Sequence, residues 1–106
     1  LNLRDHGDTH HLNRELFHSC RLPEVVGAVA RLQAEFPRHR LLLGGYSLGG
    51  NFMLRVAAEA PRARLAIAGV VAVSPVLDPA RTLDALEAGL WIYPRYFVQK
   101  WSRSLR

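Results

Sequence analysis

Residues 45–49 read Gly-Tyr-Ser-Leu-Gly, and this segment constrains the fold more than any other part of the chain. It follows a run of three leucines at 41–43 and precedes a helix-like segment that starts near Asn51. A serine flanked by small residues, where a strand passes into a helix, is typical of a sharp, strained turn in which the backbones approach closely. The pattern therefore predicts a strand-turn-helix unit from which the Ser47 hydroxyl projects.

The same turn predicts Ser47 as a nucleophile and the backbone N–H of Leu48 as a donor to a developing oxyanion. The alternative is a glycine-rich turn that only binds an anion, as phosphate loops do. No lysine follows the glycines, and their spacing does not fit a dinucleotide loop, so serine hydrolysis is favoured. Gly45, Gly49 and Gly50 are then expected to serve the tight turn and the close packing of the helix.

Hydrophobic spacing predicts alternating strands and helices over the first 73 residues. Strands are expected at residues 1–3, 40–46 and 65–73, and helices at residues 22–36 and 51–60, the latter stopped by Pro61. The last strand is almost continuously apolar, which suits a strand covered by helices on both faces. The expected fold class is therefore α/β: a partial doubly wound parallel sheet of three strands with crossover helices. Ser47 falls at a carboxyl strand end, where functional groups gather in such sheets.

The chain is long enough for one small domain but not for a complete doubly wound hydrolase. It begins with Leu1, and we expect it to be an internal fragment. Residues 1–81 are predicted to form the central part of the core, including the turn at Ser47, and residues 82–106 a lid-like helical segment of two helices. Five aromatic residues are expected to belong to the core of this lid: Trp91, Tyr93, Tyr96, Phe97 and Trp101.

Lysine and arginine outnumber aspartate and glutamate by 14 to 9, but the arginines are scattered along the chain, so nucleic-acid binding is not expected. A basic module for anionic lipid or nucleic acid stays open as a third hypothesis, as does association with a membrane surface. It rests on four cations without intervening acids: Arg95, Lys100, Arg103 and Arg106. Salt-sensitive binding would be its signature.

Cysteine use and hydropathy limit the class of protein further. The single cysteine, Cys20, excludes an internal disulfide and a thiolate metal cluster, and it is expected to be a small buried residue near a helix start. No apolar stretch approaches the roughly 20 residues that a membrane span needs. Together these features are compatible with a reducing compartment, and a cytoplasmic location is expected.

Four segments and a short tail resemble a known family. They are Asn2-Leu3-Arg4-Asp5-His6-Gly7, Leu16-Phe17-His18-Ser19, Gly45-Tyr46-Ser47-Leu48-Gly49-Gly50-Asn51, Val73-Ser74-Pro75 with Asp78, and Tyr93 with Arg95, Tyr96 and Phe97. In this order they resemble an α/β-hydrolase, and closely resemble the YheT-like hydrolase family, around its nucleophile elbow.

The resemblance implies a serine carboxylesterase or related acyl hydrolase with a Ser-Asp-His triad in that chain order. It implies that the triad acid and histidine follow Arg106, and that a second oxyanion loop precedes Leu1. The substrate would be a small-molecule acyl ester, and no cofactor is expected. The aromatic residues of the lid-like segment would favour an ester with apolar character. This chain alone is expected to be inactive, because it lacks the triad base. The rival hypothesis is a non-catalytic remnant or interaction module that keeps the elbow as a structural turn.

Other residues could carry chemistry, but each has a simpler interpretation. His6 could act as the base, although a base that precedes its serine breaks the expected order. Asp78 could act as the acid, but it is expected to shape a turn or cap the next helix. A metal site is the less favoured interpretation of a polar loop that contains Asp5, Asp8, His10, His11 and His18.

Overall fold

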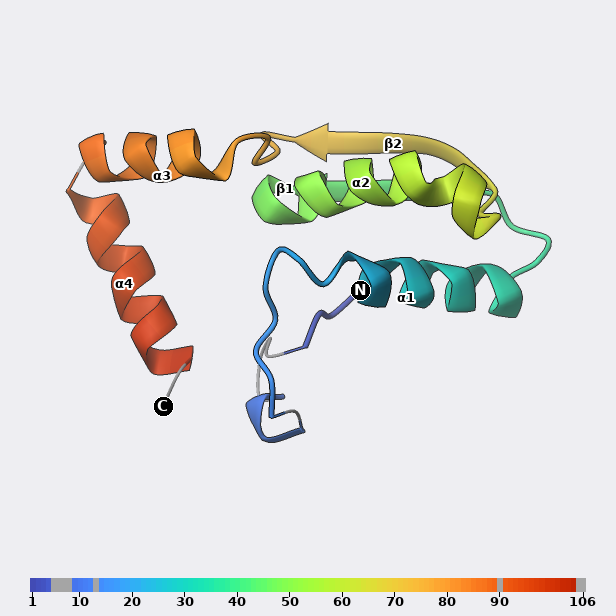
Figure 1. The fold of residues 1–106 in the computed structure, drawn as a ribbon, viewed down its shortest axis with the longest axis horizontal. Coiled ribbons are helices and arrows are strands. Elements are labelled where there is room, and N and C mark those ends of the chain that lie inside the picture. Colours follow the sequence, from blue (N-terminus) through green and yellow to red (C-terminus); the bar gives the residue numbers. More distant parts are fainter. Residues whose placement is uncertain (5–8, 13, 90, 105–106) are drawn as a thin grey trace. The chain divides into compact units, whose positions relative to one another are not determined.

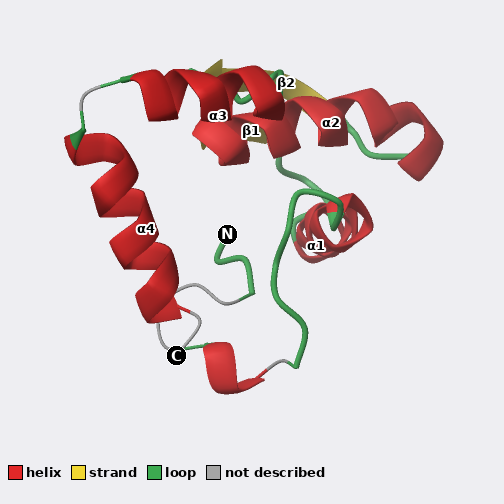
Figure 2. Ribbon diagram, turned by 60° about the vertical axis from the view of Figure 1, so that its left-hand side comes forward, coloured by secondary structure: helices red, strands yellow, loops and turns green. Residues whose placement is uncertain are grey.

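The computed structural model describes residues 1–4, 9–12, 14–89 and 91–104. The chain divides into two compact units, one of residues 18–77 and one of residues 1–17 with 78–106. More of the described chain is helical than extended (Figure 2).

The unit of residues 18–77 is a β-α-β motif preceded by a helix (Figure 1). Its elements are α1 (Leu22–Glu35), β1 (Leu41–Tyr46), α2 (Ser47–Ala63) and β2 (Ile67–Val73). The two strands pair in parallel, with Tyr46 opposite Val73 at the carboxyl end. Helix α2 packs against both strands, and α1 packs against α2. This is the α/β alternation that the hydrophobic spacing predicted for residues 22–73.

The core of this unit lies between the helices and one face of the strands. Val25 and Val29 of α1 are four residues apart and therefore share one helix face, as do Phe52 and Val56 of α2. All four side chains are almost fully buried, and Leu43 of β1 is buried with them. The helix predicted at residues 22–36 thus has a buried face at Val25 and Val29. Leu32 and Phe36, farther along the same segment, are 38% and 48% exposed.

The strand predicted at Leu1-Asn2-Leu3 is not present. These residues form no strand, and the sheet has two strands in the part of the chain that the structure describes. A strand exists only where a neighbour supplies ladder hydrogen bonds. Three residues of suitable composition do not identify such a neighbour, which is why the sequence prediction was wrong here.

The prediction that helices cover both faces of the last strand, β2, is also wrong within the unit of residues 18–77. The face turned away from α2 carries exposed apolar side chains: Leu42 is 76% exposed, Tyr46 77% and Val71 65%. The reason is that α1 packs on α2 instead of on the opposite face of the sheet. An apolar run shows that a strand tends to be buried, but not which element buries it.

Helix α2 begins four residues earlier and ends three residues later than predicted, because Pro61 lies inside its last turn. The helix ends instead at Ala63, and the next residue, Arg64, has a left-handed backbone with φ 55°. The Leu65 N–H donates to the Ala60 carbonyl at 2.9 Å and the Arg64 N–H to the Pro61 carbonyl at 3.4 Å. This pair of bonds is a Schellman motif, which normally uses glycine where Arg64 stands.

Gln33 of α1 ties the turn between α2 and β2 to the first helix. Its Nε2 donates to the Arg64 carbonyl at 3.2 Å, and its Oε1 accepts from the Ala66 N–H at 2.6 Å. Replacing Gln33 with alanine is expected to lower the free energy of unfolding by about 1 to 2 kcal/mol, since two hydrogen bonds are lost at a partly exposed site. Urea unfolding followed by circular dichroism measures the change, and an unaltered midpoint would contradict this role.

The second unit contains a short 3₁₀ helix (His10–Leu12) and the helices α3 (Pro79–Ala88) and α4 (Ile92–Ser104), which contact each other. Both helices predicted after the core are therefore present. The prediction that the aromatic side chains of this segment form a core is wrong in part. Trp91, between the two helices, is 70% exposed, and Tyr96 of α4 is 54% exposed. A helical stripe indicates which residues share a face, but these two helices alone provide little surface to bury it. The lid role of residues 82–106 stays a prediction.

Candidate active site

Ser47 lies where β1 passes directly into α2. Tyr46 is extended, with φ −108° and ψ 146°, whereas Ser47, the first residue of α2, has φ 50°. A side chain at positive φ is strained, and such strain persists only where the surrounding packing imposes it. The serine side chain is exposed. The strained, projecting turn that the sequence predicted is therefore present in the structure.

Two glycines make this turn sterically feasible. A Cβ on Gly45 would lie 2.5 Å from the backbone carbon and oxygen of Gly49. A Cβ on Gly50 would lie 3.0 Å from the Gly45 carbonyl oxygen and 3.3 Å from Cβ of Pro75. Strand and helix thus approach each other at Gly45 and Gly50, as predicted. Gly49 differs from that prediction, because a Cβ there would meet nothing within 4 Å.

The Leu48 N–H belongs to the first turn of α2. The first four N–H groups of a helix have no acceptor within it. The residue before α2, Tyr46, makes no side-chain hydrogen bond to these groups. These N–H groups also mark the positive end of the helix dipole, which favours a negative charge nearby. The site next to the Ser47 hydroxyl is therefore suited to an oxyanion.

The segment that follows β2 is held against this turn. Its Val76 N–H donates to the Ser47 carbonyl at 3.3 Å, and the Val76 carbonyl accepts from Asn51 Nδ2 at 2.7 Å. Ser74 stands next to Ser47 in the strand register, one residue beyond the Tyr46 and Val73 pair, and it too has a positive φ of 45°. Sequence reasoning missed the role of Asn51, because no local pattern links residues 25 positions apart.

Arg55 extends the network one helical turn further. Its Nη1 donates to the Ser19 carbonyl at 2.6 Å and approaches Oδ1 of Asn51 at 3.5 Å. The guanidinium carbon also lies 5.5 Å from the centre of the Phe52 ring, within the range of a cation-π contact. Arg55 therefore ties the segment before α1 to the same helix that carries Ser47 and Asn51.

Asp78 caps α3, which confirms the simpler of its two sequence interpretations. Its Oδ1 accepts from the Arg81 N–H at 3.1 Å, and its backbone carbonyl accepts from the Thr82 N–H at 3.0 Å and from the Thr82 hydroxyl at 2.8 Å. A carboxylate in this position satisfies N–H groups that a helix start leaves without a partner. Its use as a triad acid finds no support in these contacts.

The structure describes some of the other candidate residues of the polar loop and of the segment before α1. Asp5, His6 and Asp8 lie outside the described residues, and no cluster of metal ligands occurs among the residues that are described. His18 Nδ1 accepts from the Cys20 N–H at 3.3 Å, which is the polar-loop role expected of it. Cys20 stands just before α1, as expected. It is exposed, whereas the sequence predicted a buried residue. A helix start places a side chain at the edge of the core, where composition does not decide burial.

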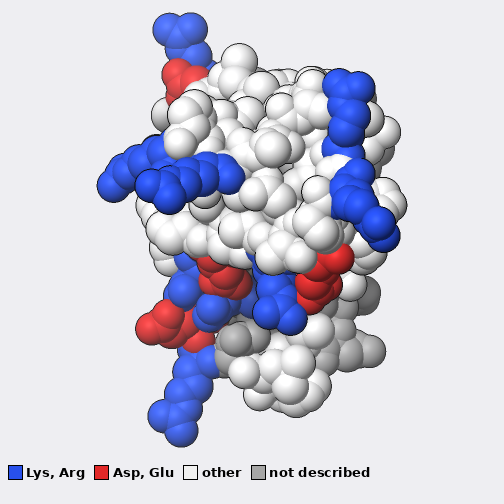
Figure 3. Space-filling model, turned by 90° about the vertical axis from the view of Figure 1, so that its right-hand side faces the viewer, with Lys and Arg blue, Asp and Glu red and all other residues white. Residues whose placement is uncertain are grey.

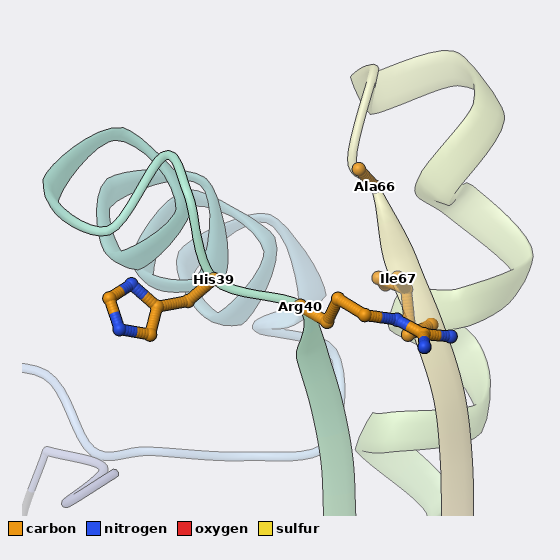
Figure 4. Close-up of a pocket in the computed structure, with 5 residues that line it drawn as sticks. His39, Arg40, Ala66 and Ile67 are labelled. Atoms are coloured by element: carbon orange, nitrogen blue, oxygen red, sulfur yellow. The ribbon is translucent and has the colours of Figure 1, made fainter.

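An open depression of about 310 Å³ lies at the amino ends of the strands. It is lined by His39, Arg40, Ala66, Ile67 and Ala68. Figure 4 shows the Arg40 side chain extending toward β2 near Ile67, while His39 points away. Because Ser47 follows the carboxyl end of β1, this depression is at the opposite end of the sheet from the nucleophile and takes no part in the candidate site.

Cationic side chains on the face in Figure 3 occur in separate groups, some of them beside acidic side chains, and do not form one continuous patch. Elsewhere in the described chain, arginines pair with acidic side chains along their own helices, including Arg31 with Glu35 at 2.7 Å and Arg62 with Glu59 at 3.8 Å. Such exposed pairs contribute little to stability. The separate groups of cations on the face in Figure 3 fit the solvated surface that scattered arginines indicate.

None of the helices in the described ranges has the length and apolar character that a membrane crossing requires. A sequence model of the alpha/beta hydrolase fold matches residues 1–99. No curated protein and no solved structure matches the chain. The family match does not support the narrower YheT-like resemblance. It covers nearly the whole chain, including the strained turn at Ser47, and the chain therefore belongs to the alpha/beta hydrolase fold family.

Proposed function

We propose that the intact protein is a serine hydrolase that cleaves carboxylic esters through an acyl-enzyme. Ser47 is the nucleophile, and the Leu48 N–H is one donor to the oxyanion. The observation that carries the proposal is the exposed Ser47 with φ 50° at a strand-to-helix junction, in a chain of the alpha/beta hydrolase fold family. Family membership alone supports hydrolase chemistry in general, and the turn at Ser47 supports the serine mechanism.

In the proposed reaction, Ser47 Oγ attacks the ester carbonyl carbon while a histidine of the intact protein takes the hydroxyl proton. The carbonyl oxygen becomes an oxyanion and accepts a hydrogen bond from the Leu48 N–H. Collapse of this intermediate expels the alcohol, which receives the proton from the histidine. Water then cleaves the acyl-enzyme by the same steps and frees Ser47. One oxyanion donor of this kind typically contributes about 3 kcal/mol to transition-state stabilisation.

An apolar acyl group fits the immediate surroundings of Ser47. Tyr46 and Leu48 flank it in the chain and both are exposed, and Leu77, at the end of the segment tied to Ser47, is 73% exposed. Burial of apolar substrate against such side chains is favourable by roughly 25 cal/mol per Å². The narrower YheT-like assignment, a cytoplasmic location and a lid formed by residues 82–106 belong to this same proposal.

Hydrolysis of p-nitrophenyl acetate, butyrate and octanoate by the purified intact protein tests the proposed function. We expect turnover of all three esters, with a lower KM for the longer acyl chains, and complete loss of activity after one equivalent of a fluorophosphonate has reacted. A folded protein that turns over none of these esters and does not react with the fluorophosphonate would instead be the non-catalytic module that keeps the elbow as a structural turn.

A further inference from the structure

We infer that Asn51 is a positioning residue for the oxyanion donor, and that it acts through Val76. The inference rests on the proposed function, because it concerns the peptide whose N–H would bind the oxyanion. It adds a residue with no direct contact to the substrate. The structure supports it through two consecutive hydrogen bonds, from Asn51 to Val76 and from Val76 to Ser47.

One peptide unit contains both the Ser47 carbonyl and the proposed oxyanion donor. The Ser47 carbonyl and the Leu48 N–H belong to the same planar group, and no cis peptide occurs in the described chain. In a trans peptide the C=O and N–H bonds point in opposite directions within one plane. Whatever fixes the direction of the Ser47 carbonyl therefore also fixes the direction of the Leu48 N–H.

A residue of the segment after β2 fixes the direction of this carbonyl. The Val76 N–H donates to it at 3.3 Å, which is slightly longer than the usual range for such bonds. A long bond from a loop residue orients its acceptor only if the loop itself is held. Asn51 holds it from the other side of Val76, because its amide donates to the Val76 carbonyl at the much shorter distance of 2.7 Å.

The Asn51 side chain has neighbours that define the orientation of its amide. Its Oδ1 lies 3.5 Å from Nη1 of Arg55, a donor, and its Nδ2 lies 2.7 Å from the Val76 carbonyl, an acceptor. Both neighbours require the same assignment of oxygen and nitrogen, so a flipped amide would face two mismatched groups. Arg55 is anchored in turn by the Ser19 carbonyl at 2.6 Å. The tether to Val76 is thus set in one orientation.

The test compares variants that remove a tether at each end of β2. Asn51→Ala removes the tether at the carboxyl end. Asn51→Asp keeps the shape but loses the N–H donor and faces the Val76 carbonyl with an acceptor. Gln33→Ala is the matched control, because Gln33 also uses its amide to hold a loop beside β2, but at the amino end. Ester hydrolysis, unfolding midpoints and inhibition by a trifluoromethyl ketone are measured on the intact protein.

Both Asn51 variants are expected to lower kcat about 10- to 100-fold with KM nearly unchanged, since a small misplacement of a catalytic group costs on this order. The affinity for the trifluoromethyl ketone, which presents an oxyanion to the site, should fall by a similar factor. Gln33→Ala should lower stability and leave kcat unchanged. A purely structural role for Asn51 would give the pattern of the Gln33 variant.

A wild-type kcat in either folded Asn51 variant would overturn the inference, as would a rise in KM at constant kcat. Failure of both variants to fold would also overturn it, because Asn51 would then serve stability and not position. The proposed function fails separately: retention of ester hydrolysis by Ser47→Ala would refute it. An inactive Ser47 variant beside a fully active Asn51 variant would refute the positioning role alone.

Discussion

Replacing Ser47 with alanine is expected to lower kcat for ester hydrolysis by about a million-fold, which is the loss that follows removal of the nucleophile from a catalytic triad. The substitution deletes only the exposed hydroxyl. It leaves the close approach of Gly45 and Gly50 intact, so the free energy of unfolding should change little. Initial rates on a p-nitrophenyl ester, with circular dichroism to confirm folding, measure the effect.

Ser74→Ala is the control for this substitution. Ser74 follows the adjacent strand, occupies the neighbouring register position, is exposed and has a positive φ of 45°, so it shares the backbone strain of Ser47. Unlike Ser47, however, Ser74 does not begin a long helix. We expect the Ser74 variant to keep its kcat. A similar loss in both variants would point to disruption of the strand ends and not to a nucleophile.

Replacing Gly45 with alanine is expected to lower the free energy of unfolding by about 3 kcal/mol, at the upper end of the cost of overpacking. The new Cβ would lie 2.5 Å from the Gly49 carbon and oxygen and 2.7 Å from the Gly50 nitrogen. All three are backbone atoms and cannot rotate away as a side chain can. The start of α2 must therefore move from β1, and esterase activity should fall together with the midpoint of denaturant unfolding.

Gly49→Ala makes the same chemical change four residues further along the chain, within α2. A Cβ at Gly49 would meet nothing within 4 Å, and alanine is favoured over glycine within helices by up to about 1 kcal/mol. This variant should be at least as stable as the wild type. Equal destabilisation by the two substitutions would contradict the account, because it would mean that any side chain is rejected here and not only one that faces the helix.

Local pattern was sufficient for the elements around the site. The stripe that includes Val25 and Val29 identified α1, and the leucines at 41–43 followed by Gly-Tyr-Ser-Leu-Gly identified the strand, the turn and the helix after it. These signals work because side-chain spacing and glycine sterics act within a few residues. The start of α2 was placed too late, since the helix begins at Ser47 itself.

Features that depend on long-range packing could not be obtained in this way. The bond from Asn51 to Val76 joins residues 25 apart, and the exposed face of Leu42 and Val71 depends on where α1 packs. The end of α2 was misplaced because Pro61 lies in the final turn, where it removes only one hydrogen bond. The helix stops at the left-handed backbone of Arg64, and such a stop is usually recognised in a sequence by a glycine, which is absent at this position.

Identification of the residue that a fluorophosphonate modifies tests the central claim most directly. The intact protein is labelled, digested and analysed by tandem mass spectrometry, with heat-unfolded protein as the control. We expect a single adduct on Ser47 that requires the folded state, because an unactivated serine hydroxyl does not react. An adduct on another serine, or none on Ser47 in protein that hydrolyses esters, would contradict its assignment as the nucleophile.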